Sequence, residues 1–125
     1  MASCCEALTP QAASVIIWNT VDWKIVKILP FHTYTVYAME FSFNDRYFAT
    51  AGKDRKLAIY SCDLTLLYSC EPHLRAITCL SFHHNENYLI TGSRDKTIKL
   101  HNMKSKTITA ELNCQHPVSA VAFCL

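Results

Sequence analysis

Two sets of side chains in this sequence have the residue types that general acid–base or nucleophilic chemistry uses. Each set has a histidine, a threonine, an aspartate and a ring residue. The two sets are His32, Thr50, Asp54 and Tyr60, and His73, Thr91, Asp95 and His101. Threonine, histidine and aspartate could form a hydrolase triad, but threonine is a rare nucleophile away from an N-terminus. The same groups, when buried, must hydrogen-bond to one another, and their recurrence favours such a structural network.

The two sets belong to a repeat that runs through the whole sequence. Phe41, Phe82 and Phe123 are 41 residues apart, and Tyr47 and Tyr88 keep the same step. Within each repeat, short apolar runs alternate with turns rich in Asn, Gly and Asp, which predicts antiparallel strands. Four strands in a period of about 40–45 residues are typical of a β-propeller blade of the WD40 kind.

The predicted fold class is therefore all-β, an unclosed WD40 β-propeller fragment of about three four-stranded blades with no helix. A closed propeller has about 4–8 blades, more than 125 residues supply. The predicted units are an incomplete blade at 1–31, blades at 32–72 and 73–115, and the first strand of a further blade at 116–125. The inner strands are predicted at Val36–Phe41, Ala76–Phe82 and Val118–Leu125.

The offsets of the two sets fit a hydrogen-bond network that ties parts of one blade together. The histidine comes from the loop between blades, the threonine from the second strand, and the aspartate from the turn before the third strand. The ring residue, usually tryptophan, lies on the third strand. Tyr60 and His101 stand at that position, which predicts that both networks are weakened.

Basic residues gather in the turns between the second and third strands of each repeat. They are Lys53, Arg55 and Lys56, and Arg94, Lys96 and Lys99. Equivalent turns of neighbouring blades share one rim, so these charges would form a stripe. Exposed turns are commonly charged, but the stripe also suits an acidic partner or RNA phosphate. No aromatic residues interleave with it in the sequence, so base stacking is not indicated.

Other features exclude several classes of site. The seven cysteines form no C-x-x-C pair, which indicates neither a disulfide framework nor a zinc site. Cys79, His83 and His84 suggest a metal, but adjacent histidines point apart in extended chain, so a solvated turn is favoured. We expect no cofactor. Free thiols fit a reducing compartment, and no apolar run is long enough to span a membrane.

An unclosed propeller predicts uncovered faces at both ends. One end is expected to expose Ile16, Ile17 and Trp18, and the other Val118, Val121 and Phe123. Apolar patches of this kind are rare on soluble monomers, and the last strand would offer unpaired backbone groups. We therefore expect self-association through the uncovered blade faces.

Several short stretches carry a more specific resemblance. They are Ser3-Cys4, Val15–Thr20, Trp23-Lys24, Phe31-His32, Thr35-Val36, Met39–Ser42, Thr91–Lys96 and Val118–Ala122. These stretches resemble the Elongator complex subunit 2 family. The resemblance implies a whole protein of two seven-bladed propellers that acts as a scaffold. Its complex modifies wobble uridines in tRNA, with catalysis on a different subunit.

The function expected from these observations is a non-catalytic WD40 scaffold in an Elongator-like complex. Its partners would be other protein subunits, with indirect or weak tRNA contact and no membrane, in the cytoplasm or also the nucleus. Two alternatives stay open. One is a generic WD40 adaptor in another assembly, such as a ubiquitin ligase or a signalling complex. The other is a hydrolase that uses the Thr-His-Asp sets.

Overall fold

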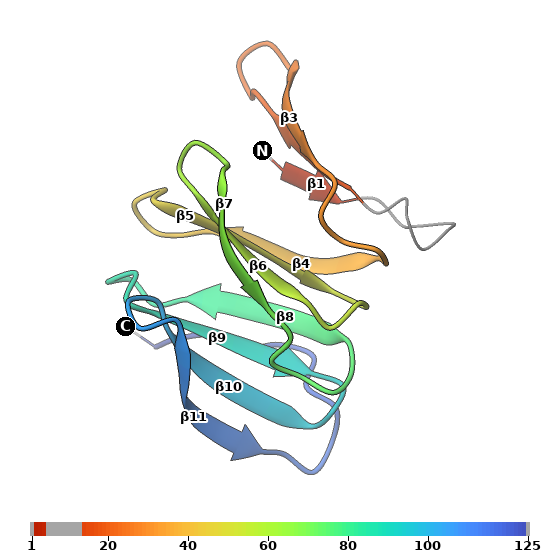
Figure 1. Ribbon diagram of the computed structural model, residues 1–125, viewed down its shortest axis with the longest axis vertical. Helices are drawn as coiled ribbons and strands as arrows, with labels where there is room; N and C mark the ends of the chain where they lie inside the picture. The colour runs from red at the N-terminus through yellow and green to blue at the C-terminus, as the bar shows by residue number, and fades with distance from the viewer. Residues whose placement is uncertain (1, 5–13, 125) are drawn as a thin grey trace.

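The computed structural model describes residues 2–4 and 14–124, which form three antiparallel sheets stacked side by side (Figure 1). The first sheet has three strands: β1 (Ala2–Cys4), β2 (Val15–Trp18) and β3 (Ile25–Leu29). The second has four: β4 (Val36–Phe41), β5 (Tyr47–Gly52), β6 (Leu57–Ser61) and β7 (Leu66–Cys70). The third also has four: β8 (Ile77–Phe82), β9 (Tyr88–Ser93), β10 (Thr97–Asn102) and β11 (Thr107–Asn113).

Each strand pairs with its neighbours in the chain, so every sheet is a simple antiparallel meander. The predicted all-β, unclosed partial propeller is confirmed, and the described residues contain no helix. It follows that no helix in the described part of the chain is long and apolar enough to cross a membrane. Of the predicted inner strands, Val36–Phe41 is found as β4, and Ala76–Phe82 is found as β8 with its start at Ile77.

Two apolar cores lie between the sheets, and β6 contributes to both. Ala58 and Tyr60 pack with residues of the first sheet, such as Val15. Leu57 and Ile59 pack with residues of the third sheet. Because side chains alternate across a strand, β6 is buried on both faces. Because both faces of β6 are buried, its sequence does not alternate between apolar and polar residues.

The hairpin turns repeat together with the sequence. Asp45 and Glu86 occupy equivalent turns with φ of 58° and 60°, and Arg55 and Lys96 do so with 67° and 68°. This left-handed conformation is uncommon for residues other than glycine. Its recurrence shows that equivalent turns have the same backbone shape, so their side chains leave the blades at the same end.

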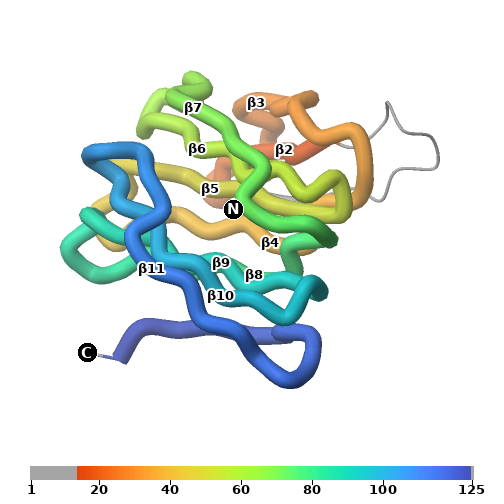
Figure 2. Tube along the Cα trace, turned by 60° about the horizontal axis from the view of Figure 1, so that its bottom comes forward, coloured from red at the N-terminus to blue at the C-terminus, as the bar shows by residue number. Residues whose placement is uncertain are grey.

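The C-terminal segment differs from the prediction. Val118–Leu125 is predicted as a strand, but residues 118–124 form no strand. A strand requires a partner that continues its hydrogen-bond ladder, and none lies beside this segment in the described part of the chain. The segment runs back along the third sheet instead (Figure 2).

The two end faces are also less open than predicted. Ile17 is only 6% exposed because it packs into the core between the first two sheets. Its neighbour Ile16 is half-buried. Val118, Val121 and Phe123 are half-buried as well, since their segment packs on the third sheet.

Candidate functional site: two histidine networks and a basic surface

The first network ties the loop before β4 to the strands β5 and β6. His32 Nδ1 donates to the Asp54 carboxylate at 2.9 Å, and His32 Nε2 lies 2.7 Å from Thr50 Oγ1. The backbone amides of Thr33 and Lys56 also donate to Asp54, each at 3.2 Å. The structure therefore brings His32, Thr50 and Asp54 together, and both ring nitrogens of His32 are engaged.

The second network repeats this arrangement in the third sheet and extends it. His73 Nδ1 donates to Asp95 at 3.0 Å, and His73 Nε2 lies 2.8 Å from Thr91 Oγ1. The Thr97 hydroxyl and amide both donate to Asp95, as does the amide of Leu74. At the other end, His101 Nε2 lies 2.9 Å from Thr91 Oγ1.

The shifted pKa values describe which groups carry charge. Burial alone would raise the pKa of Asp95, but donors from Thr97 and Leu74, together with His73, lower it to about 2. Burial lowers the pKa of His101 to about 4, helped by His73 and Lys99. Burial also lowers the pKa of His73, against the opposing effect of Asp95. Asp95 is thus ionised and both histidines are neutral near pH 7.

Neutral histidines give this network a single consistent direction. His73 Nδ1–H donates to Asp95, Thr91 Oγ1–H donates to His73 Nε2, and His101 Nε2–H donates to Thr91. Every polar group in that chain is therefore satisfied, as buried polar groups must be. Thr50 and Thr91 are both 0% exposed. A hydroxyl with no surface is not placed to attack a substrate, so the geometry favours the structural network over the hydrolase.

Tyr60 differs from its counterpart His101. Its ring is buried and lines a groove between β3 and β7, but its hydroxyl has no hydrogen-bond partner among the described residues. Burial raises the pKa of the Tyr60 hydroxyl, and the Thr50 hydroxyl beside it partly opposes that rise, although the two groups do not have the geometry of a hydrogen bond. In the third sheet, by contrast, His101 donates to Thr91 where tryptophan is usual. The weakening of the two networks stays a prediction.

The predicted basic residues lie mainly at one end of the blades. Lys53 and Arg55 are exposed in the turn between β5 and β6, and Arg94 and Lys96 are exposed in the turn between β9 and β10. Both turns lie on the right in Figure 1. Together with Tyr34 and Tyr37, described next, these four side chains are called the basic surface below.

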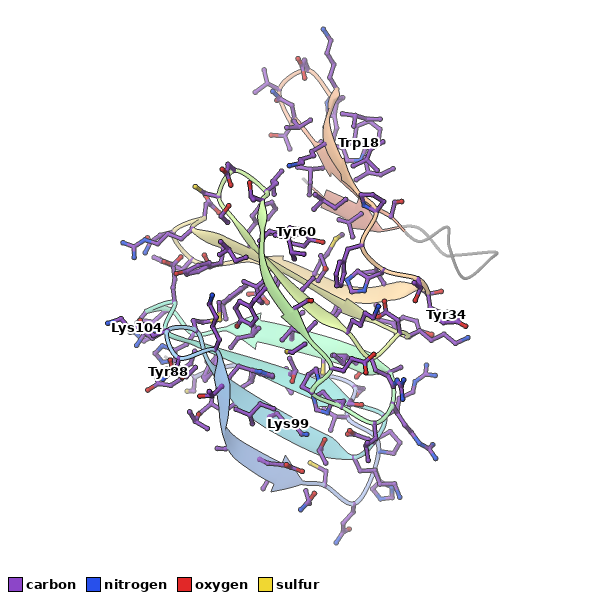
Figure 3. All side chains as sticks on the ribbon, in the orientation of Figure 1. Trp18, Tyr34, Tyr60, Tyr88, Lys99 and Lys104 are labelled. Carbon is purple, nitrogen blue, oxygen red and sulfur yellow. The ribbon has the colours of Figure 1, made fainter. Side chains whose placement is uncertain are left out.

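Aromatic rings do interleave with these charges, contrary to the prediction. Lys53 Nζ lies 6.0 Å from the centre of the Tyr34 ring, and Arg94 Cζ lies 5.3 Å from the Tyr37 ring. Tyr34 and Tyr37 are 43% and 39% exposed, and Figure 3 shows Tyr34 at the edge of the molecule. Since Tyr37 belongs to the second sheet and Arg94 to the third, the surface continues across two blades.

Sequence reasoning missed the two tyrosines because they come from another segment. They flank the start of β4, whereas the cations lie in the β5–β6 and β9–β10 turns. The signal available was topological. The loop that leads into an inner strand lies at the same end of the blade as the turn between the second and third strands. Residues near Thr35 are therefore expected to lie close to Lys53. The Lys53 amide indeed donates to the Thr35 carbonyl at 2.8 Å.

Two of the predicted basic residues are engaged elsewhere. Lys56 is half-buried, and its Nζ lies 5.6 Å from the Phe31 ring centre. Lys99 lies on β10, where its ammonium group donates to the Pro72 carbonyl and lies 3.8 Å from a Glu111 oxygen. These two side chains stabilise the blades and are not part of the basic surface.

Glu86 links two blades at the opposite end and was not predicted. It lies in the β8–β9 turn, and its carboxylate accepts from Ser42 Oγ at 2.5 Å and from the Asn44 amide at 2.7 Å. Burial alone would raise the pKa of Glu86, but these donors and Arg46 lower it. Its counterpart Asp45 is exposed, so the repeat itself contained no signal for this contact.

Two of the three residues considered for a metal site, His83 and His84, lie close together. The rings of His83 and His84 are 4.1 Å apart, so the expectation that they point apart is wrong. Cys79 lies on β8. Among the described residues, no group of three or more His, Cys, Asp or Glu side chains could hold a metal ion. Cys62, Cys70, Cys79 and Cys114 are free thiols.

A comparison with family models matches the WD domain, G-beta repeat, at residues 23–61 and 64–102. Each matched repeat begins at the outer strand of one sheet, or the turn just before it, and ends at the third strand of the next. A sequence repeat therefore spans parts of two blades, and the chain within one repeat links two neighbouring sheets. The predicted blade at 32–72 instead follows the second sheet.

Curated relatives are about a third identical to this chain over the stretch that matches. Elongator complex protein 2 of Homo sapiens is 32% identical over 112 residues, which cover 78% of this chain and 14% of the relative. The protein of the same name in Arabidopsis thaliana is 32% identical over 108 residues, with 80% and 13% covered. In Schizosaccharomyces pombe it is 30% identical, with 98% and 17% covered. The chain thus spans about a seventh of the length of these relatives.

Solved structures show the same fold. The crystal structure of RRP9 WD40 repeats matches with a TM-score of 0.82 and 22% identity, covering 90% of this chain and 36% of that one. The structure of U3-55K matches with the same TM-score and identity, covering 37% of that chain. Both likenesses are evidence for the arrangement of the blades.

Proposed function

Because the chain belongs to the WD40-repeat family, we propose that it acts as a non-catalytic scaffold, as a subunit 2-like part of an Elongator-type complex. The similarity to proteins named Elongator complex protein 2 supports the assembly. The continuous basic surface supports a binding role, and one contact in particular carries this proposal. Arg94 of the third sheet reaches the Tyr37 ring of the second, which joins two blades into one face.

The two networks support the scaffold by holding that face in place. His32 and His73 fix the loops before β4 and β8 to the turns that bear the cations. Fixed loops lose less conformational entropy when they bind a partner. Cations beside half-exposed tyrosines suit an acidic protein segment, since arginine and tyrosine are enriched at interfaces. The other subunits of the complex are therefore the partners we infer.

Affinity purification of the tagged chain, followed by quantitative mass spectrometry, tests this function. We expect Elongator subunits to be enriched, and the double variant Lys53→Glu/Arg94→Glu to lose most of that enrichment. Lys104→Glu is the matched control, because Lys104 is exposed in the β10–β11 turn at the opposite end (Figure 3). Enrichment of subunits of a ubiquitin ligase or signalling complex would support the generic adaptor instead.

A second candidate is contact with single-stranded RNA, which the interleaved tyrosines favour. Bases stack on exposed aromatic rings, and nearby cations neutralise phosphates. Fluorescence anisotropy with tRNA at two salt concentrations measures this directly. We expect Tyr34→Ala and Tyr37→Ala to weaken binding, and Lys53→Glu to lower the salt dependence. Binding that is unchanged in all three variants would rule out this surface as an RNA contact.

A further inference from the structure

An apolar groove lies at the junction between the first and second sheets. It has a volume of about 340 Å³ and runs between β3, the outer strand of the first sheet, and the start of β7, the outer strand of the second. Ligand sites in proteins measure about 300–1,000 Å³, so this groove suits a ligand about the size of one large side chain. Its apolar lining comes from Ile28, Leu29, Pro30, Phe31, Leu64 and Leu66.

The strand register shows which residue holds the corresponding place at the junction between the second and third sheets. Lys27 pairs with Ile17, just before the register shift between β2 and β3. Tyr68 pairs with Ile59, just before the register shift between β6 and β7. Ile17 packs toward the second sheet and Ile59 toward the third, and cross-strand partners share a face. Lys27 and Tyr68 are therefore equivalent residues, each directed at the next sheet.

An aromatic ring fills this place at the second junction, whereas the first junction has none there. Tyr68 packs against the core between the second and third sheets, and its hydroxyl donates to Met103 Sδ at 3.6 Å. Lys106 Nζ lies 5.4 Å from the centre of the Tyr68 ring. At the first junction, Lys27 Nζ donates to the Leu64 carbonyl at 3.1 Å. The long, thin lysine side chain leaves the groove open beside it.

We propose that this groove binds a linear segment of another protein, which inserts one aromatic side chain and carries an acidic residue next to it. The inserted ring takes the place that Tyr68 takes at the second junction. Lys27 then lies beside that ring as Lys106 lies beside Tyr68. The inference goes beyond the scaffold function proposed above, because none of the residues that line the groove belongs to the basic surface.

The charges around the groove complement such a segment. Among the described residues that line it, Lys27 alone is charged, and it is exposed. Lys56 adds a second cation, since its Nζ lies 5.6 Å from the centre of the Phe31 ring. Asp63 lies in the adjacent turn, where it accepts from the Thr65 amide at 3.2 Å, so the cations outnumber the acid. A cation attracts the face of an aromatic ring, and it attracts a neighbouring carboxylate as well.

Exposed apolar side chains at the groove give the ring a packing surface. Ile28 on β3 is 50% exposed, and Leu66 on β7 is 42% exposed. An inserted ring would cover both, and an aromatic side chain buries about 150–250 Å² of surface. Aromatic anchors that fill a pocket provide much of the binding energy at protein interfaces. Packing and charge at this groove therefore favour the same kind of ligand.

Two substitutions that fill the groove distinguish this site from any other. Lys27→Tyr copies the second junction and places a ring in the groove. Thr65→Trp fills the groove from the side of β7, at an exposed position. Lys27→Ala removes the same ammonium group but leaves the groove open. Lys104→Tyr is the matched control for an added ring, because Lys104 is exposed and lies far from Tyr60, which lines the groove (Figure 3).

Selection from a random peptide library displayed on phage tests the proposal, with the full 125-residue chain as bait. The Lys27→Tyr chain serves for counter-selection, which removes peptides that bind elsewhere. We expect the enriched peptides to share an aromatic residue next to an aspartate or glutamate. A fluorescein-labelled copy of an enriched peptide then measures affinity by anisotropy. In the wild-type chain, this peptide should shift the amide resonances of residues 27–31 and 64–66.

We expect both filling variants to weaken binding of this peptide about 30-fold or more, as the loss of an aromatic anchor does. Lys27→Ala should weaken it only about two- to five-fold, as the loss of one exposed cation–π contact does. Lys104→Tyr should leave it unchanged. The double variant Lys53→Glu/Arg94→Glu should also leave it unchanged, so failure of the basic surface and failure of this site are separate results.

Three results would overturn the proposal. One is a library that yields no enriched peptide, or only peptides without an aromatic residue. Another is a set of amide shifts that avoids residues 27–31 and 64–66. The third is full binding by the filling variants when their circular dichroism spectra match that of the wild-type chain. If Lys27→Tyr fails to fold, Thr65→Trp replaces it in the counter-selection, and the amide shifts of the wild-type chain still locate the peptide.

Discussion

The second and third sheets carry the same histidine, threonine and aspartate at the same offsets, yet their networks end differently. In the second sheet Asp54 accepts from His32 and from two backbone amides. In the third sheet Asp95 accepts in addition from the Thr97 hydroxyl. Lys56 stands at the position of Thr97, 41 residues earlier, and provides only its amide.

The opposite ends of the networks differ as well. His101 reaches Thr91 at 2.9 Å, while the Tyr60 hydroxyl lacks a partner within the described residues. Histidine and tyrosine both replace tryptophan there, but only the histidine places a nitrogen at the threonine. The comparison shows that a repeated motif fixes where side chains lie, whereas the atoms at its ends decide how many hydrogen bonds are made.

The largest expected effect comes from removing the aspartates. Asp95→Ala leaves the His73 ring, two amides and the Thr97 hydroxyl without their acceptor, so we expect a loss of about 3 kcal/mol in the free energy of unfolding. Asp54→Ala leaves fewer donors, and about 2 kcal/mol is expected. Urea denaturation of both variants measures the difference. Equal losses would remove the distinction between the networks, and a neutral Asp95→Ala would refute the network itself.

The threonines should show the same asymmetry with a smaller effect. Thr91→Val removes the hydrogen-bond partner of both His73 and His101, and we expect a cost of about 2 kcal/mol. Thr50→Val removes the partner of His32 and only a weaker contact with the Tyr60 hydroxyl, and should cost about 1 kcal/mol. Valine has the same shape, so packing is nearly unchanged. Thermal melts give the ranking. An ester hydrolysis assay on the same proteins tests the hydrolase alternative. Measurable turnover that Thr91→Val abolishes would contradict a purely structural role for Thr91.

Acid should affect the third sheet more than the second. His101 has a folded pKa of about 4, below its ordinary value of about 6.5. Its neutral form is favoured by folding, so its contribution to stability is complete above pH 6.5 and is lost as the pH falls toward 4. His101→Tyr, which copies the second sheet, should recover on the order of 1 kcal/mol of the loss between pH 7 and pH 5. Parallel pH profiles of the two proteins would contradict this assignment.

The smallest effect is expected from adding the missing hydroxyl to the second sheet. Lys56→Thr places a donor beside Asp54 as Thr97 does beside Asp95, and about 0.5 kcal/mol of stabilisation is expected. The reciprocal Thr97→Lys should destabilise by at least that amount. Denaturant midpoints determine both values. Destabilisation by Lys56→Thr would show that the contact between Lys56 and Phe31 matters more than the hydroxyl.

Much of the fold could be predicted because strand alternation, turn residues and the repeat period are local sequence patterns. The 41-residue period and the alternation within it predicted the inner strands β4 and β8 to within one residue. The offsets of His73, Thr91 and Asp95 predicted which side chains meet, because a repeated backbone brings repeated positions to the same place. The failure at residues 118–124 has a definite cause. A strand-like sequence becomes a strand only beside a partner strand, and the described part of the chain provides none.

The sequence by itself determined the blades, their order and the positions of the network, since alternation and turn residues act over a few neighbouring positions. Only the tertiary structure decided that Arg94 lies on Tyr37 and that Glu86 reaches Ser42. It also decided that His101 is joined to its network while Tyr60 is not. These outcomes depend on how two sheets pack against each other. A displacement of about 1 Å between donor and acceptor is enough to lose a hydrogen bond. No spacing along the chain encodes a distance of that kind.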